Sequence, residues 1–179
     1  MFYPEGPGAL HPQTARLLNT IERRFNEFCA SYRGLTPEQL LLPGVTGEWS
    51  VRDLIAHVTW WEEEALKHVP TVLAGGRPER YSTAYGGIDA FNALMTRQRA
   101  HLPLEHVLAQ QTTVHRKLIG IVADIPLAEL GGNSRIRRRI RLDTYGHYPL
   151  HTKQIIAWRE ASGFSVAQAA QPELFPKST

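Results

Sequence analysis

The chain has 179 residues, a net charge of +3 and one cysteine, Cys29. A chain of this length fits one domain and can bury roughly 70% of its unfolded surface. A single cysteine excludes an internal disulfide and any zinc site built from several thiolates. Its 42% hydrophobic and 21% charged residues are ordinary for a globular protein, and the small net charge says little about partners by itself.

The N-terminal stretch MFYPEGPGALHP lacks the basic and then apolar order of a signal peptide. No apolar run approaches the ~18 residues that a membrane-spanning helix needs. We therefore expect a cytoplasmic protein with no membrane partner. We also expect one domain over residues 1–179, with peripheral tails at residues 1–12 and 165–179.

Apolar residues recur at intervals of three and four along four long segments, which predicts amphipathic helices. The first helix covers about residues 13–33 and ends at Gly34. The second starts at Ser50, with Asp53 placed to support its N-terminal end, and stops at Gly75.

The third segment covers about residues 88–125, and Pro103 should kink or split it because proline removes a backbone donor. The last helix covers about residues 145–162, after a turn-rich stretch in which residues 136–142 hint at strand-like alternation. The connection 75–87 is long enough to cross the end of a bundle, which argues against a simple up-down-up-down order. The prediction is an all-α fold, a four-helix bundle with a long crossover connection.

Two histidines, His147 and His151, lie four residues apart in the stretch YGHYPLHTKQIIAW. At this spacing they share one helix face, ~6 Å apart along the axis, and Ile155 and Trp158 continue that face. Pro149 is tolerated between them because the first helical turn lacks intrahelical partners. The pair can hold a metal ion, or it can be two core histidines with hydrogen-bond partners.

A third metal ligand has to come from a facing helix. His57 is the best candidate, because it lies beside the apolar seam of the second helix, two turns from that helix's N-terminus. His68 lies on the same flank but ~16 Å further along the axis. If the two helix ends sit together, His57, His147 and His151 meet as a histidine triad. The histidines of the third segment are expected to be surface or capping residues: His101, His106 and His115.

The segment GEWSVRDLIAHVTWWEEE, followed later by YGHYPLHTKQIIAWRE, resembles the DinB-like (DinB/YfiT-like) superfamily, and within it the branch called ClbS/DfsB or DinB_2. The resemblance spans about residues 14–162, and its strongest part is the pairing of W-S-V-x-D-x-x-x-H with H-x-x-x-H. It implies a four-helix bundle with a long crossover, a homodimer in many members, and a divalent metal held by His57, His147 and His151.

Three neutral imidazoles leave open positions on a bound ion, as in catalytic sites, and zinc, nickel and iron all suit such ligands. The ion can lower the pKa of bound water to ~7 or hold a thiolate. The resemblance implies a small-molecule substrate, with a metal-dependent hydrolase or a thiol S-transferase as the enzyme class and a low-molecular-weight thiol as a candidate cofactor. The alternative is a non-catalytic stress-protection or binding module of the same fold.

Glu64 is the candidate general base, because it follows His57 by seven residues and lies ~10 Å along the same flank. The competing interpretation makes residues 62–64 a solvated acidic face. Tyr148 can point its phenol toward the proposed site or away from it.

Five arginines fall within residues 135–141, directly before the last helix. The simplest interpretation is a solvated loop. Arg137 and Arg139 are nevertheless candidates to bind an anionic substrate or thiol cofactor, because guanidinium groups match carboxylates. Nucleic-acid binding is a further alternative, but the modest charge and the lack of a second basic stretch argue against it.

Overall fold

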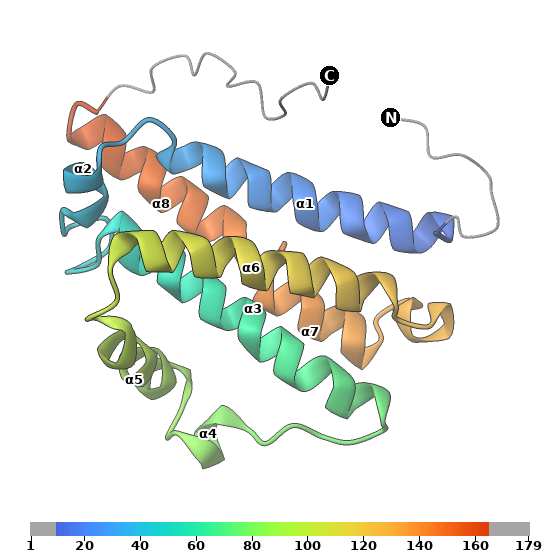
Figure 1. Ribbon diagram of the computed structural model, residues 1–179. Helices are drawn as coiled ribbons and strands as arrows, with labels where there is room; N and C mark the ends of the chain where they lie inside the picture. Colours follow the sequence, from blue (N-terminus) through green and yellow to red (C-terminus); the bar gives the residue numbers. More distant parts are fainter. Residues whose placement is uncertain (1–9, 165–179) are drawn as a thin grey trace.

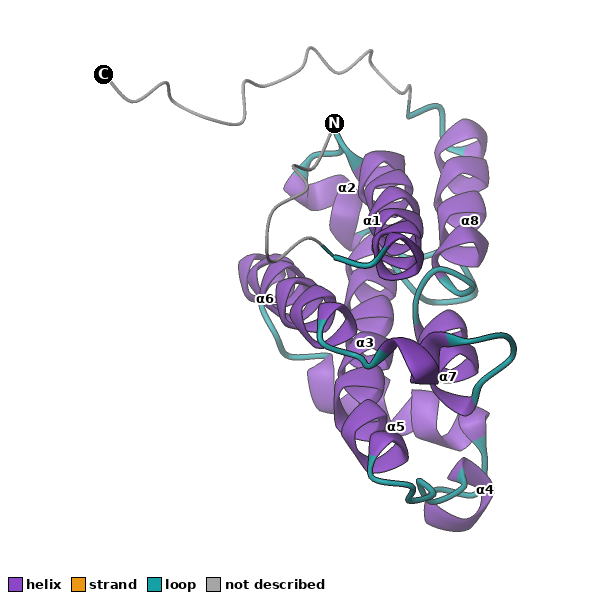
Figure 2. Cartoon of the chain, turned by 90° about the vertical axis from the view of Figure 1, so that its right-hand side faces the viewer, coloured by secondary structure: helices purple, strands orange, loops and turns teal. Residues whose placement is uncertain are grey.

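The computed structural model describes residues 10–164, and in this part of the chain all regular structure is helical (Figures 1 and 2). The α-helices are α1 (Pro12–Tyr32), α2 (Pro37–Leu41), α3 (Val51–Leu73), α4 (Tyr81–Ala84), α5 (Ile88–Arg99), α6 (Leu104–Ala123), α7 (Arg135–Asp143) and α8 (Tyr148–Ala161), and η1 (Leu127–Leu130) is a 3-10 helix. The all-α prediction is confirmed. The two tails expected from the sequence lie almost entirely outside the described residues. None of the described helices has the length and apolar character needed to cross a membrane.

Helix α3 starts where its cap predicts. At the start of α3, the Ser50 hydroxyl accepts a hydrogen bond from the backbone N–H of Asp53 (3.2 Å), and the Asp53 carboxylate accepts one from the backbone N–H of Ser50 (3.0 Å). This reciprocal capping box satisfies two donors that have no intrahelical partner. Helix α1 ends just before Gly34, whose φ of +80° suits glycine.

The helices pack around one apolar core. Helix α3 packs against α6 and α7, while α1 packs against α8 and α6. Helices α3 and α6 run in the same direction in Figure 1, and the chain returns between them through α4 and α5. The predicted departure from an up-down-up-down order is therefore confirmed. The third expected segment forms two helices, α5 and α6, and α7 is an additional helix before the last one.

The split between α5 and α6 lies at Pro103, as the sequence predicts. The buried guanidinium of Arg52, in the first turn of α3, holds this corner. Its Nη2 donates to the carbonyl oxygens of Arg99 and Leu102, both at 2.5 Å, and its Nη1 donates to Asp53 at 2.7 Å. The position of α5 beside the bundle is therefore tied to the start of α3.

The arginine run is helix α7, so both the expected loop and the hint of a strand are wrong. Ser134 caps the helix by accepting a hydrogen bond from the backbone N–H of Arg137 (3.1 Å). Ile136 and Ile140 are fully buried and lie four residues apart, on one helix face. Arginine is also a good helix former, so the local propensity agrees with the helix that packing against α3 favours.

Candidate metal centre

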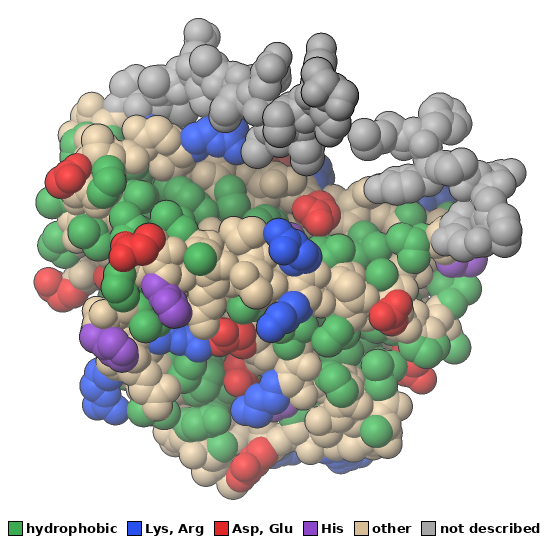
Figure 3. Space-filling view, viewed as in Figure 1, with side chains coloured by type: hydrophobic (Ala, Val, Ile, Leu, Met, Phe, Trp, Pro, Cys, Tyr) green, Lys and Arg blue, Asp and Glu red, His purple; other side chains and the backbone are tan. Residues whose placement is uncertain are grey.

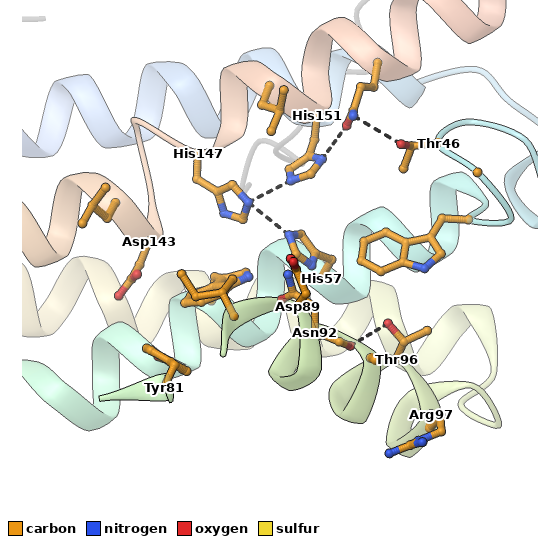
Figure 4. Close-up of a pocket in the computed structure, with 18 of the residues that line it drawn as sticks. Thr46, His57, Tyr81, Asp89, Asn92, Thr96, Arg97, Asp143, His147 and His151 are labelled. Atoms are coloured by element: carbon orange, nitrogen blue, oxygen red, sulfur yellow. Dashed lines mark hydrogen bonds between the residues drawn. The ribbon is translucent and has the colours of Figure 1, made fainter. Parts of the chain in front are cut away.

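Three imidazoles converge from the N-terminal parts of α3 and α8. His57 comes from the second turn of α3, His147 is the N-cap residue of α8, and His151 lies in the first turn of α8. The distance from His147 Nε2 to His57 Nε2 is 3.1 Å, and to His151 Nε2 it is 2.8 Å (Figure 4). One ligand atom from each ring lies within 4.8 Å of the others. The expectation that these three imidazoles meet is confirmed, although α8 begins after His147 rather than at residue 145.

The donor set fits a divalent metal ion. The Oε1 atom of Gln154, 2.8 Å from His151 Nδ1, can only accept a hydrogen bond, so Nδ1 carries the proton and Nε2 is left with a lone pair. Among the described residues, Nδ1 of His57 and Nδ1 of His147 have no partner. If these rings are also protonated at Nδ1, three lone pairs face one point, which is unfavourable unless a cation lies between them.

The surroundings keep the imidazoles neutral. Burial, with the neighbouring imidazoles, lowers the pKa of His57 to about 2 and the pKa of His147 to about 3. Burial also lowers the pKa of His151, against the hydrogen bond to Gln154. Neutral imidazole is the form that binds metals, so the site is ready for an ion at neutral pH without losing a proton.

A pocket of about 1030 Å³ opens onto the three histidines. Trp49 and Trp61 form aromatic walls, with ring centroids 5.0 Å from His57 and 6.0 Å from His147, respectively. The opposite wall is the polar face of α5, which Figure 4 shows across from α8. Its residues are Asp89, Asn92, Thr96 and Arg97. This wall was missed from the sequence, although its first three residues recur at intervals of three and four, which is the signal of a polar helix face.

Glu64 lies behind the pocket wall rather than among the residues that line it. Its carboxylate accepts hydrogen bonds from the Tyr81 hydroxyl (2.6 Å) and from His68 Nε2 (2.9 Å). Burial opposes ionisation of Glu64, but the Tyr81 hydrogen bond and the charge of Lys67 outweigh it and lower its pKa. Tyr81 itself lines the pocket, so Glu64 contacts the pocket only through that phenol.

Arg139 and Arg137 have different environments. Arg139 lines the pocket, where its Nη2 donates to the Tyr81 hydroxyl (2.9 Å) and its Nε donates to Asp143 (2.5 Å). Arg137 Nη1 donates to the carbonyl oxygen of Leu130 (3.2 Å), and Arg137 is not among the described residues that line the pocket. Of these two arginines, Arg139 is therefore the one placed to meet a ligand.

The expected solvated acidic face is wrong, because Glu62 and Glu64 are buried. Glu62 has 0% exposure, and its Oε1 atom accepts hydrogen bonds from the Tyr148 hydroxyl (2.6 Å) and from His115 Nδ1 (2.9 Å). Burial raises the pKa of Glu62 against these contacts. The phenol of Tyr148 therefore points away from the histidine triad and into the core.

The expected surface position of His115 is also wrong. Its ring is buried and stacks on Phe25, with ring centroids 3.5 Å apart. His101 and His106 are exposed as predicted, and histidine side chains lie on the surface where α5 meets α6 (Figure 3). Glu62 supplies the partner that makes burial of the His115 imidazole tolerable.

Replacing Tyr148 with phenylalanine should lower the free energy of unfolding by about 1–3 kcal/mol, because Glu62 loses a buried donor. Urea denaturation at pH 7 measures the change. Tyr145→Phe is the matched control, because Tyr145 is only partly buried, and it should change stability by less than about 0.5 kcal/mol. Equal stability of the two variants would show that the Tyr148 hydrogen bond contributes nothing.

Comparison with known proteins gives one family and two similar structures. A family model described as the DinB superfamily matches residues 18–155. The crystal structure of an uncharacterised protein from Escherichia coli UTI89 is similar with a TM-score of 0.72 and 20% identity, covering 86% of this chain and 97% of the other. A structure named Sibling Lethal Factor Precursor – DfsB is similar with a TM-score of 0.70 and 12% identity, covering 85% and 98%. At 20% and 12% identity, the similarity to these two structures shows only that this chain shares their fold. No curated protein matches the chain.

Proposed function

The chain belongs to the DinB superfamily, and on that premise we propose that it binds one divalent metal ion through His57, His147 and His151 and acts with it on a small molecule. The observation that carries the proposal is the convergence of three Nε2 atoms at 2.8 and 3.1 Å in the floor of a large pocket. Three neutral imidazoles, two of them buried, with one open side match catalytic rather than structural metal sites.

A divalent ion bound there supplies Lewis-acid chemistry, polarising a carbonyl group, activating water or binding a thiolate. Neighbouring side chains orient the three histidines and cover the sides of the proposed metal position. Gln154 fixes the ring of His151, while Trp49 and Trp61 exclude water from the flanks of the triad. This supports either a metal-assisted hydrolase or a transferase that uses a low-molecular-weight thiol. Zinc, nickel and iron all suit the ligand set.

The proposal includes an anion-binding role for Arg139. Its guanidinium is held by Asp143 and Tyr81 at the edge of the pocket, so little entropy is lost when it binds a carboxylate. Arg137 is a weaker candidate for binding an anion, because its guanidinium already donates a hydrogen bond to the carbonyl oxygen of Leu130. Glu64 can act as a base only through the Tyr81 hydroxyl, so its proposed part is to orient that phenol. The homodimer and the cytoplasmic location stay predictions.

Metal analysis of protein purified without a histidine tag tests the site. After addition of Zn²⁺ and desalting, we expect about one ion per chain in the wild-type protein and at least ~100-fold weaker binding in His151→Ala, since even supporting residues of metal sites contribute 10–100-fold. His101→Ala is the matched control, because His101 is exposed and does not line the pocket. Equal metal content in the His151→Ala variant and the wild-type protein would disprove the assignment. A metal-loaded protein without turnover of thiol conjugates or hydrolysable substrates would favour the binding module.

A further inference from the structure

Three large aliphatic side chains stand exposed around the mouth of the pocket. Ile88 of α5 is 55% exposed, Leu142 of α7 is 60% exposed and Leu150 of α8 is 55% exposed. All three line the pocket, and we refer to them as the aliphatic rim. Single exposed aliphatic residues are normal on protein surfaces, but three from separate helices around one opening indicate a surface that a ligand covers.

The apolar surface continues from the aliphatic rim into the pocket. The ring of Trp61 lies 5.4 Å from that of Tyr81, and both rings line the pocket together with Trp49. A ligand in this pocket therefore contacts aromatic side chains as well as the histidines. Such walls favour a hydrocarbon or aromatic body and give little support to a small, fully hydrated substrate.

The polar end of the pocket is set by Arg139. A guanidinium has five N–H donors, and Asp143 and Tyr81 engage two of those on Arg139. Among the described residues no partner engages the other three. Arg97 adds a second cation on the α5 wall, and the pocket is also lined by the carboxylates of Asp89 and Asp143. The fixed fork of Arg139 is suited to one carboxylate or a similar anionic group.

We infer, building on the proposed function, that the ligand of this pocket is an amphipathic anion, with its charged group at Arg139 and an apolar body against the aliphatic rim. A pocket of about 1030 Å³ is large enough for a drug-sized molecule. A second copy of the chain is the other way to cover the rim. Three side chains are far fewer than the roughly 20–30 residues per partner in a stable interface, so a small molecule fits better.

Straight-chain carboxylates test this inference without knowledge of the natural substrate. Binding of acetate, hexanoate and octanoate is measured by titration calorimetry, once with metal-free protein in EDTA and once with Zn²⁺-loaded protein. We expect octanoate to bind at least ~10-fold more tightly than acetate, because each added methylene buries apolar surface, and 1-octanol to bind more weakly than octanoate. Affinity independent of chain length, or equal affinity for 1-octanol, would overturn the inference.

Variants locate the two ends of the ligand. The triple variant Ile88→Asn, Leu142→Gln, Leu150→Gln should weaken octanoate binding about 10-fold and leave acetate within about two-fold. Arg139→Gln should weaken the binding of both octanoate and acetate. Leu41→Gln is the matched control, because Leu41 is 52% exposed but lies on α2, away from the pocket. Unchanged octanoate binding by the triple variant would overturn the inference. If the triple variant also sediments differently from the wild-type protein, the aliphatic rim belongs to a dimer interface instead.

These experiments distinguish failure of the proposed metal site from failure of the proposed ligand class. If no Zn²⁺ binds but the metal-free protein keeps the chain-length dependence and the effect of the rim variant, the metal proposal fails and the ligand class stands. If Zn²⁺ binds at the triad but the carboxylates show no chain-length dependence, the ligand class fails and the metal site stands.

Discussion

We expect the titration of His57 and His147 alone to cost the metal-free protein roughly 3–5 kcal/mol of unfolding free energy as the pH falls from 6.5 to 4.5. The pKa of His57 is about 2 and that of His147 about 3, because burial and the nearby imidazoles disfavour the charged forms. In the unfolded chain both groups have a pKa of about 6.5, so below this pH the unfolded state takes up protons that the folded state does not. Each group then costs about 1.4 kcal/mol of stability per pH unit, down to its folded pKa.

Glu62 has the opposite sign. Burial raises its folded pKa, so the stability it contributes is largest at low pH and is lost as the pH rises from its ordinary value through the folded one. Asp143 acts in the same direction, because burial raises its pKa to about 7. Both carboxyl groups therefore offset part of the histidine effect as the pH falls.

Urea denaturation in EDTA between pH 7.5 and 4.5 measures the slope of stability with pH. His57→Gln should flatten this slope by about 1.4 kcal/mol per pH unit, because one shifted group is gone. His101→Gln, at an exposed position, should leave it unchanged. A slope that is the same in His57→Gln and in the wild-type protein would mean that His57 titrates normally in the folded state.

The variant Arg52→Met should lower the free energy of unfolding by about 3–5 kcal/mol, the usual cost of breaking a buried charge pair. Arg52 is buried, donates to three backbone carbonyl groups at the corner between α5 and α6, and pairs with Asp53. Methionine fills much of the same space but donates nothing, so the carbonyl oxygens and the Asp53 carboxylate lose this donor.

The effect of Arg52→Met should spread to the pocket, because α5 has few other anchors. Among them are the buried ring of Phe91, the packing of Met95 against the core, and the ion pair between Arg99 and Glu63. Hydrogen exchange should therefore quicken across α5 more than across α1. Arg23→Met is the control, since Arg23 pairs with Glu27 on an exposed surface, and its loss should cost less than about 1 kcal/mol. A loss below 1 kcal/mol for Arg52→Met would contradict the anchoring role.

The parts of the fold that follow from local rules could be predicted from the sequence. The ends of α3 follow from the capping pair of Ser50 and Asp53 and from Gly75, and the break between α5 and α6 follows from Pro103. The helical period predicts which face His57 and His151 take, whereas the meeting of the three imidazoles was conditional on two helix ends lying together and was implied by the family resemblance. His57 lies beside the apolar seam of α3, and His151 lies on the apolar face of α8.

The features that could not be predicted depend on partners distant in the chain. Three consecutive glutamates resemble a solvated face, and the burial of Glu62 depends on His115, 53 residues away, and on Tyr148, 86 residues away. The alternation of Ile136, Ile140 and Leu142 is compatible with a strand as well as a helix, and only packing against α3 decides between them. No local signal shows which way α5 turns after the crossover, so the polar pocket wall was not expected.

The separation of the triad along the chain also determines how the protein would acquire the proposed metal. His57 and His147 are 90 residues apart, so they come together only after the crossover has formed and the last third of the chain has packed. Early in folding an ion meets isolated histidines, which hold it weakly. Long-range contacts of this kind form late, because closing a large loop is entropically costly. Metal capture is therefore the last step of folding rather than its nucleus, and a chain that has bound its metal tightly is one that has finished folding.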